Sequence, residues 1–185
     1  MNKTLIVILA VVAVVVLWGF SGYNSLITMN ERADAQWATV ETQYQRRFDL
    51  IPNLVNSVKA VLTQEQTVFG ELADARARYS GASSPNERAS AATQVESALS
   101  RLLVIVENYP QLQSSQNVRD LMAQLEGTEN RISVERTRFN DMIRDYNASI
   151  KRFPKNLLAS MFGFNVRSYF EAVTGAENAP TVNFE

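Results

Sequence analysis

The sequence has no cysteine and no histidine among its 185 residues. Without cysteine the chain forms no disulfide and supplies no thiolate nucleophile. Without histidine it lacks the usual general base, the usual zinc ligand and the central member of serine and cysteine triads. We therefore expect a protein that is not an enzyme and that uses no metal and no other cofactor.

Glycine and proline are also scarce, at 7 and 5 residues. Alanine, glutamine, glutamate, arginine and leucine dominate after the first 22 residues, and this composition favours helices. The sequence therefore predicts an all-α chain. Its 18 basic and 19 acidic residues leave a formal net charge of -1. This balance argues against a nucleic-acid partner, because such partners are held by many basic contacts to phosphates.

One long apolar run is present, from Leu5 to Phe20, with the sequence LIVILAVVAVVVLWGF. A helix that spans a membrane needs about 20 apolar residues, and the small residues up to Gly22 bring the run into that range. Aromatic rings at its far end suit the lipid headgroup layer. We predict that residues 1–22 form a transmembrane anchor in contact with lipid, represented by Leu5, Val12, Trp18 and Phe20.

The alternative for this segment is a signal peptide with a cleavage site at residues 19–21. The helical pattern resumes almost at once after the run, which favours an anchor. Lys3 lies closer to the run than Arg32, the first base on the other side. Bases flanking a span favour the cytoplasmic side, so we expect the amino terminus inside and the bulk of the chain outside. The opposite orientation stays the alternative.

A long helix is expected to follow the anchor directly. From Leu26 to Leu72, apolar or large residues recur three and four positions apart, as in coiled coils and bundles. The pattern keeps its phase across Pro52, where we expect a bend. We predict that this helix reaches about Tyr79.

A second long helix is predicted to begin at Ser84, which can form a capping box with Glu87. It must end before Pro110, because proline disfavours helix in the residue that precedes it. Residues 110–116 are interpreted as a linker.

A third long helix is predicted to start near Asn117 and to stop before Pro154, and a short helix ending at Gly163 follows it. The predicted architecture is an antiparallel bundle of three long helices and one short carboxyl-terminal helix. Its domain covers residues 23–175, and residues 176–185 are expected to form a flexible tail.

These reversals predict the direction of the third helix. If the first helix leads away from the membrane and the second returns, the third leads away again. The apolar segment from Phe153 to Phe164 is then expected far from the membrane anchor.

Several short blocks, in this order along the chain, resemble the LemA family and together cover about residues 23–170. They are Tyr23-Asn24, Trp37, residues 45–55 (QRRFDLIPNLV), residues 107–110 (ENYP), residues 128–132 (TENRI), Tyr146-Asn147, Phe153-Pro154 and Gly163-Phe164. The resemblance implies a bacterial single-pass membrane protein with a helical-bundle domain, and no agreed biochemical activity. The resemblance implies an inner-membrane location but not the side of the bulk domain; the flanking bases favour the periplasm, with the cytoplasm as the alternative.

Charged and amide side chains on the first and third helices are candidates for interior polar contacts that set the helix register. The alternative is that they lie on solvated faces. These candidate structural residues are Arg46, Arg47, Asp49, Glu129, Asn130 and Arg131.

The last part of the chain is rich in large apolar side chains. They can close the end of the bundle, or they can form an exposed patch for self-assembly or for a partner. The candidate patch consists of Phe153, Met161, Phe162, Phe164, Tyr169 and Phe170.

The sequence thus favours a non-enzymatic scaffold that self-assembles at the bacterial inner membrane and organises membrane or envelope proteins. Its expected partners are lipid, further copies of itself and an unidentified envelope protein. The alternative is an adaptor that binds a partner protein through one face of the bundle.

Overall fold

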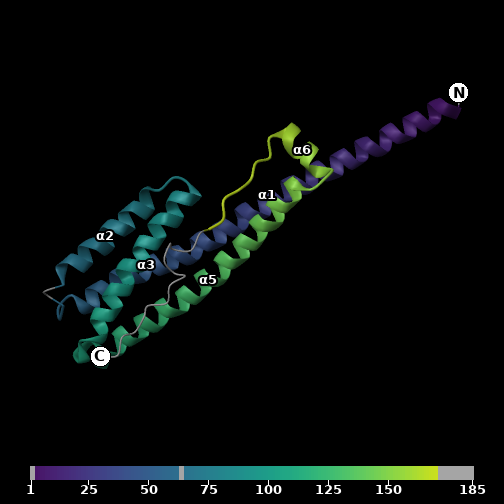
Figure 1. Cartoon of the computed structure of the whole chain (residues 1–185). Helices are drawn as coiled ribbons and strands as arrows, with labels where there is room; N and C mark the ends of the chain where they lie inside the picture. The colour runs from purple at the N-terminus through teal and green to yellow at the C-terminus, as the bar shows by residue number, and fades with distance from the viewer. Residues whose placement is uncertain (1–2, 63–64, 171–185) are drawn as a thin grey trace, which may run out of the picture. The chain divides into compact units, whose positions relative to one another are not determined.

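A computed structural model describes residues 3–62 and 65–170, and the expected flexible tail lies outside these residues. The described part contains helices and no strand, which confirms the all-α prediction. Figure 1 shows the helices in chain order: α1 (Lys3–Val58), α2 (Gln66–Gly81), α3 (Pro85–Glu107), α4 (Pro110–Ser114), α5 (Gln116–Lys151) and α6 (Lys155–Phe162).

The chain divides into two compact units. Among the described residues, the first unit consists of residues 3–39 and 135–169, and therefore holds the start of α1, the end of α5 and all of α6. The second unit consists of residues 40–62, 65–134 and 170, and holds the rest of α1 and α5 together with α2, α3 and α4. Each unit is described by itself below.

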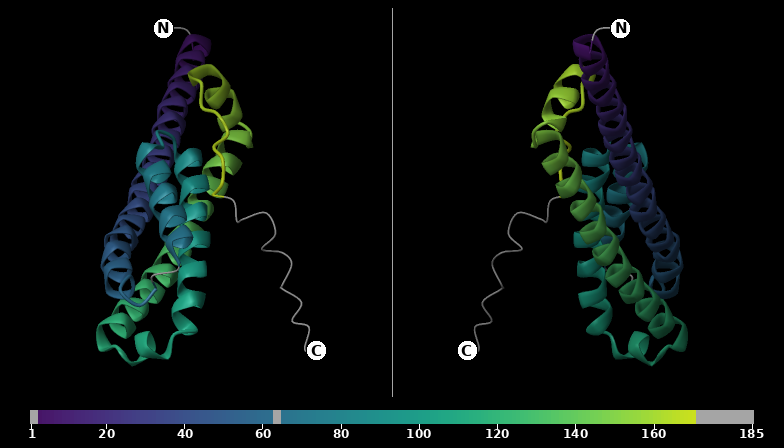
Figure 2. Two further views of the ribbon diagram at one scale, coloured as in Figure 1. Left: turned by 90° about the vertical axis from the view of Figure 1, so that its left-hand side faces the viewer. Right: turned by 90° about the vertical axis from the view of Figure 1, so that its right-hand side faces the viewer.

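The first predicted helix is in fact two helices. α1 passes through Pro52 without ending, and it stops at Val58 rather than near Tyr79. α2 then buries Leu72 and Ala75 within the second unit, and it runs beside α3 in both views of Figure 2. A repeat of apolar residues cannot distinguish one long helix from two successive helices that each bury the same stripe.

The prediction for α3 is confirmed at both ends. The Ser84 side chain accepts a hydrogen bond from the Glu87 backbone N–H, and the Glu87 carboxylate accepts one from the Ser84 backbone N–H. The helix ends at Glu107, three residues before Pro110. The predicted linker after it includes α4, a single helical turn.

In the second unit, aromatic rings from α1 and α2 pack together. The ring of Phe48 lies 4.5 Å from that of Tyr79 in an edge-on arrangement, and the ring of Tyr44 lies 5.8 Å from Tyr79. The Tyr44 hydroxyl donates a 3.0 Å hydrogen bond to Glu96 of α3. These contacts join α1, α2 and α3.

In the first unit, α5 runs antiparallel to α1. The ring of Phe139 lies 5.3 Å from that of Trp37, whereas Tyr146, further along α5, packs with Leu26, which is closer to the start of α1. After α6, Arg167 donates hydrogen bonds to Asp34 at 2.5 Å and to Asn30 at 2.9 Å, both on α1.

The short helix α6 packs on α1 at Gly22 and Tyr23, directly after the apolar run, so the expectation that it lies far from the anchor is wrong. The Tyr23 ring lies 4.7 Å from the Phe162 ring. A Cβ on Gly22 would lie only 2.6 Å from Leu158 Cδ1, so the absence of a side chain there permits the contact. The break after Val58 adds one chain reversal, and α5 therefore returns to the anchor end of α1.

The end of α6 follows the prediction. Gly163 has a φ of 75°, a left-handed conformation that glycine adopts without steric cost, and it stops the helix. The Phe164 backbone N–H then donates a 2.9 Å hydrogen bond to the Ala159 carbonyl.

Candidate membrane anchor and interaction surfaces

The apolar start of α1 makes almost no contact with the rest of the chain. Among the described residues, α1 is the one helix with a stretch long and apolar enough to cross a membrane. The predicted anchor residues are exposed: Leu5 at 50%, Val12 at 52%, Trp18 at 38% and Phe20 at 65%. Burial begins at Gly22, where α6 packs on α1. The exposed apolar surface is what a lipid-facing helix requires.

α6 has one buried face and one exposed apolar face. Leu158 and Ala159 join the core of the first unit with Leu26. Leu157 and Met161, four residues apart and so on one side of the helix, are 55% and 76% exposed. Large apolar side chains that are this exposed and lie next to one another are typical of a contact surface rather than of a surface that faces water.

The structure divides the six residues of the candidate patch. Phe164 is half-buried, with its ring 5.9 Å from the Tyr23 ring, and Phe170 is buried. The others remain exposed: Phe153 at 79%, Met161 at 76%, Phe162 at 54% and Tyr169 at 45%. The segment from Phe153 to Phe170 thus buries some of its apolar side chains in the core and leaves others exposed on the surface.

Basic residues surround this segment. Residues 146–170 contain four bases and no acid, in a chain whose formal net charge is -1. Lys155 donates a 2.9 Å hydrogen bond to Ser25 of α1, and Arg167 pairs with Asp34. Lys151 and Arg152 are exposed and form no ion pair with any described residue. The sequence suggested only a helix-dipole role for these two bases, and neither they nor Leu157 were among the predicted interaction residues, although the acid-free interval marks them.

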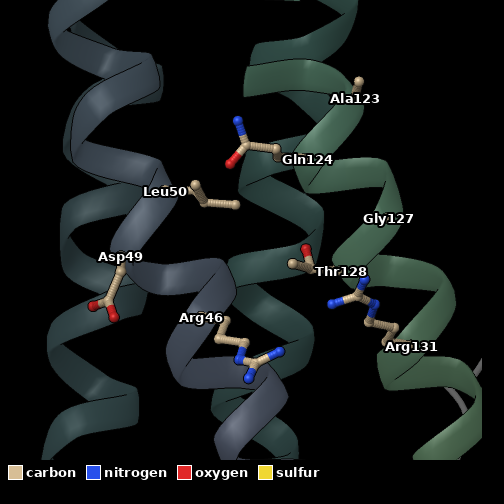
Figure 3. Close-up of a pocket in the computed structure, with 8 residues that line it drawn as sticks. All are labelled: Arg46, Asp49, Leu50, Ala123, Gln124, Gly127, Thr128 and Arg131. Carbon is tan, nitrogen blue, oxygen red and sulfur yellow. The ribbon is translucent and has the colours of Figure 1, made fainter. Parts of the chain in front are cut away.

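An open groove lies between α1 and α5 in the second unit. Figure 3 shows the guanidinium groups of Arg46 and Arg131 on facing sides of it, while the Asp49 carboxylate points away from α5. Neither arginine forms an ion pair with a described residue. The lining residues are Arg46, Asp49, Leu50, Ala123, Gln124, Gly127, Thr128 and Arg131. Two guanidinium groups that face each other across a groove and form no ion pair with a described residue have the chemistry to bind a carboxylate.

Beside the groove, Arg47 of α1 forms an ion pair with Glu129 of α5. The Arg47 side chain is 6% exposed and that of Glu129 is 44% exposed. Burial lowers the pKa of the Arg47 guanidinium, while the nearby Glu96 and Tyr44 act in the opposite direction. Its Nε is buried and has no hydrogen-bond partner among the described residues.

Of the six candidate structural residues, two therefore form this pair and three line the groove. The sixth, Asn130, is exposed. No three carboxylates within residues 3–62 and 65–170 lie close enough together to hold a metal ion.

These features define a membrane-associated all-α protein, in which one apolar helix continues into a helical bundle. Residues 36–184 match the model of the LemA family, and the chain therefore belongs to the LemA family. Magnetosome protein MamQ of Magnetospirillum gryphiswaldense is 30% identical, and the alignment covers 80% of this chain and 64% of that protein. Magnetosome protein MamQ 2 of Paramagnetospirillum magneticum is 29% identical with the same coverage. The chain thus spans a little under two-thirds of the length of these relatives.

Proposed function

We propose that this protein is a non-enzymatic, membrane-anchored scaffold that self-assembles at the bacterial inner membrane and organises membrane or envelope proteins. One observation carries the proposal: the apolar span and the bundle share a single unbroken helix, α1, from Lys3 to Val58. Within the first unit, burial against α5 and α6 begins at Gly22, directly after the apolar run.

A rigid joint of this kind suits a scaffold. A flexible linker would let a bundle sample all orientations, whereas a continuous helix holds the first unit in a fixed orientation to the bilayer. Copies held in one membrane in one orientation also meet at a high effective concentration, which favours assembly through weak contacts. The MamQ relatives are named as magnetosome proteins, and this association with a subcellular structure supports an organising role.

For the orientation we propose the amino terminus in the cytoplasm and the bundle in the periplasm, with a cytoplasmic bundle as the alternative. Lys151 and Arg152 do not bear on the orientation, because the rule that bases favour the cytoplasmic side concerns residues that flank the span in sequence. Since the chain has no cysteine, Val104→Cys, at a site 58% exposed on α3, supplies a single thiol. A membrane-impermeant maleimide should label it in intact spheroplasts. Labelling only after lysis would place the bundle in the cytoplasm.

Self-assembly is tested on the full-length protein extracted in a mild detergent. Light scattering and negative-stain images should give particles of several copies, whose mass exceeds that of one 20.7 kDa chain plus its detergent. Mass spectrometry of the same sample checks that residues 1–20 are retained. A monodisperse monomer that retains them, also after transfer to lipid nanodiscs, would rule out the scaffold.

The adaptor function is the second candidate, and the groove between α1 and α5 favours it. A photo-crosslinking residue at Gln124 should then yield one discrete protein adduct in cells, and Arg131→Glu should abolish that adduct. Lys59→Glu is the matched control, because Lys59 is an exposed base of the same unit outside the groove. An adduct equally sensitive to both variants would reflect net charge, and no adduct would rule out the groove as a docking site.

A further inference from the structure

We propose that the segment from Lys151 to Tyr169, with α6 at its centre, is a second membrane contact. It lies in the headgroup layer of the leaflet from which α1 emerges, with its apolar side chains among the lipid chains and its bases on anionic lipid phosphates. The inference rests on the proposed role of α1 as a membrane span, and it does not depend on self-assembly.

The position of α6 along α1 is the first argument. The hydrocarbon core of a bilayer is about 30 Å thick and takes about 20 helical residues, which places its far boundary near Tyr23 when the span begins at Thr4. α6 packs on α1 at that level, since Leu158 contacts Gly22 and the Phe162 ring lies against Tyr23. In Figure 1 the amino-terminal part of α1 extends beyond α6.

The second argument is the absence of charge on the part of α1 that α6 covers. No charged residue occurs between Lys3 and Glu31. The stretch from Ser21 to Asn30 is therefore compatible with the polar boundary of a bilayer, although it lies beyond the apolar run. The first charges at this level come from the bases at the end of α5 and the start of α6.

The third argument is the pattern of the segment. Leu158 and Ala159 face the core, whereas Phe153, Leu157 and Met161 are 79%, 55% and 76% exposed. Helices that lie in the membrane interface combine such an apolar face with Lys and Arg at its border. Here Lys151 and Arg152 directly precede Phe153 in the chain, and both are exposed with no acidic partner among the described residues.

The charge balance selects lipid over a second copy of this segment. Residues 146–170 carry four bases and no acid, so two such segments face to face would place like charges together. An anionic leaflet neutralises them instead, and each Lys or Arg near such a surface contributes about 1 kcal/mol.

The depth of the segment is tested with single cysteines in the full-length protein, each carrying an environment-sensitive fluorophore, in vesicles of phosphatidylcholine and phosphatidylglycerol. We expect lipids with a spin label high on the acyl chain to quench a probe at Met161→Cys as strongly as one at Phe20→Cys. A probe at Ala35→Cys should stay unquenched, because this exposed α1 site lies 13 residues, about 20 Å, beyond Gly22.

The outcomes separate the two proposals. If a probe at position 20 is not quenched, α1 does not span the membrane, and the proposed function is refuted as well. Quenching at position 20 without quenching at position 161 would refute only the membrane contact of α6. Oxidation of the Phe153→Cys variant tests whether a second copy of the chain, rather than lipid, covers this surface. Efficient disulfide dimers, combined with an unquenched probe at position 161, would identify the surface as an interface between copies.

The role of the bases is tested by comparing spin-labelled phosphatidylglycerol with spin-labelled phosphatidylcholine as quenchers at position 161. The preference for phosphatidylglycerol should fall about fivefold for each base lost in Lys151→Gln and Arg152→Gln, which corresponds to ~1 kcal/mol per base. The control pair Arg32→Gln and Lys59→Gln removes the same charge from exposed sites outside the segment and should leave the preference unchanged. An equal loss in both pairs would refute specific lipid binding.

Discussion

The ion pair between Arg47 and Glu129 should respond unequally to removal of its two partners. Arg47 is almost fully buried and its Nε has no hydrogen-bond partner within the described part of the chain, whereas nearly half of the Glu129 side chain is exposed. A buried charge that loses its partner keeps its full desolvation cost, while a half-exposed carboxylate can turn to water. We therefore expect Glu129→Gln to destabilise the protein more than Arg47→Met.

The magnitudes follow from the burial of each group. Glu129→Gln keeps an acceptor but exchanges a charge-assisted hydrogen bond for a neutral one, which costs about 1–2 kcal/mol. Arg47→Met removes the attraction together with the desolvated guanidinium and its unpaired Nε, so its net effect should stay within about 1 kcal/mol. The double variant with methionine at position 47 and leucine at position 129 should lie close to the single Arg47→Met variant.

The assay is thermal unfolding of the full-length protein in mild detergent, followed by circular dichroism at 222 nm. For a chain of this length, Glu129→Gln should lower the Tm by roughly 3–6 °C. Glu71→Gln is the control, because its 2.8 Å pair with Arg101 joins side chains that are 42% and 65% exposed, and such pairs contribute little. A larger loss of Tm in Arg47→Met than in Glu129→Gln would refute this account of the pair.

Three further predictions concern the described helices. Burial raises the pKa of Tyr79 to about 12, so the stability that depends on its protonated hydroxyl is complete below pH 10 and is lost as the pH rises through 12. This loss should amount to about 1–2 kcal/mol of the free energy of unfolding, allowing for partial exposure. Tyr79→Phe should therefore reduce the fall in Tm between pH 10 and 12, and an unchanged Tm–pH profile would contradict this account. A Tyr23→Cys, Phe162→Cys double variant should form an intramolecular disulfide on oxidation, while cysteines at Gln36 and Phe162 should not; the opposite result on reducing and non-reducing gels would refute the position of α6. Ser84→Ala should cost about 1 kcal/mol through loss of the capping box, measured by thermal unfolding, whereas Ser84→Gly should cost only a few tenths; equal losses would show that the cap is not the cause.

Local chemistry made several features of this protein predictable. The uncharged run from Leu5 to Phe20 has no place in a water-exposed helix, so the sequence alone indicated a membrane anchor. The ends of α3 followed from Ser84, Glu87 and Pro110, because capping and proline act within a few residues. The left-handed Gly163 ended α6 for the same local reason.

Other features depended on contacts between distant residues. The apolar repeat on α1 and α2 could not reveal the reversal after Val58, because each helix buries the same stripe on its own. That single reversal set the direction of α5 and brought α6 to Gly22 rather than to the far end. Likewise, spacing could not show that Arg47 pairs with Glu129 while Arg46 lines an open groove.

The amino-acid sequence by itself thus determined the helical class, the apolar run of the candidate anchor, the ends of α3 and the carboxyl end of α6, because each depends on composition or on near neighbours. Only the tertiary structure decided which apolar residues remain exposed. Leu157 and Leu158 are adjacent and chemically identical, yet the first is 55% exposed and the second is buried. Their difference arises from where α1 lies, and it leaves an apolar face of α6 exposed beside the end of the apolar run of α1.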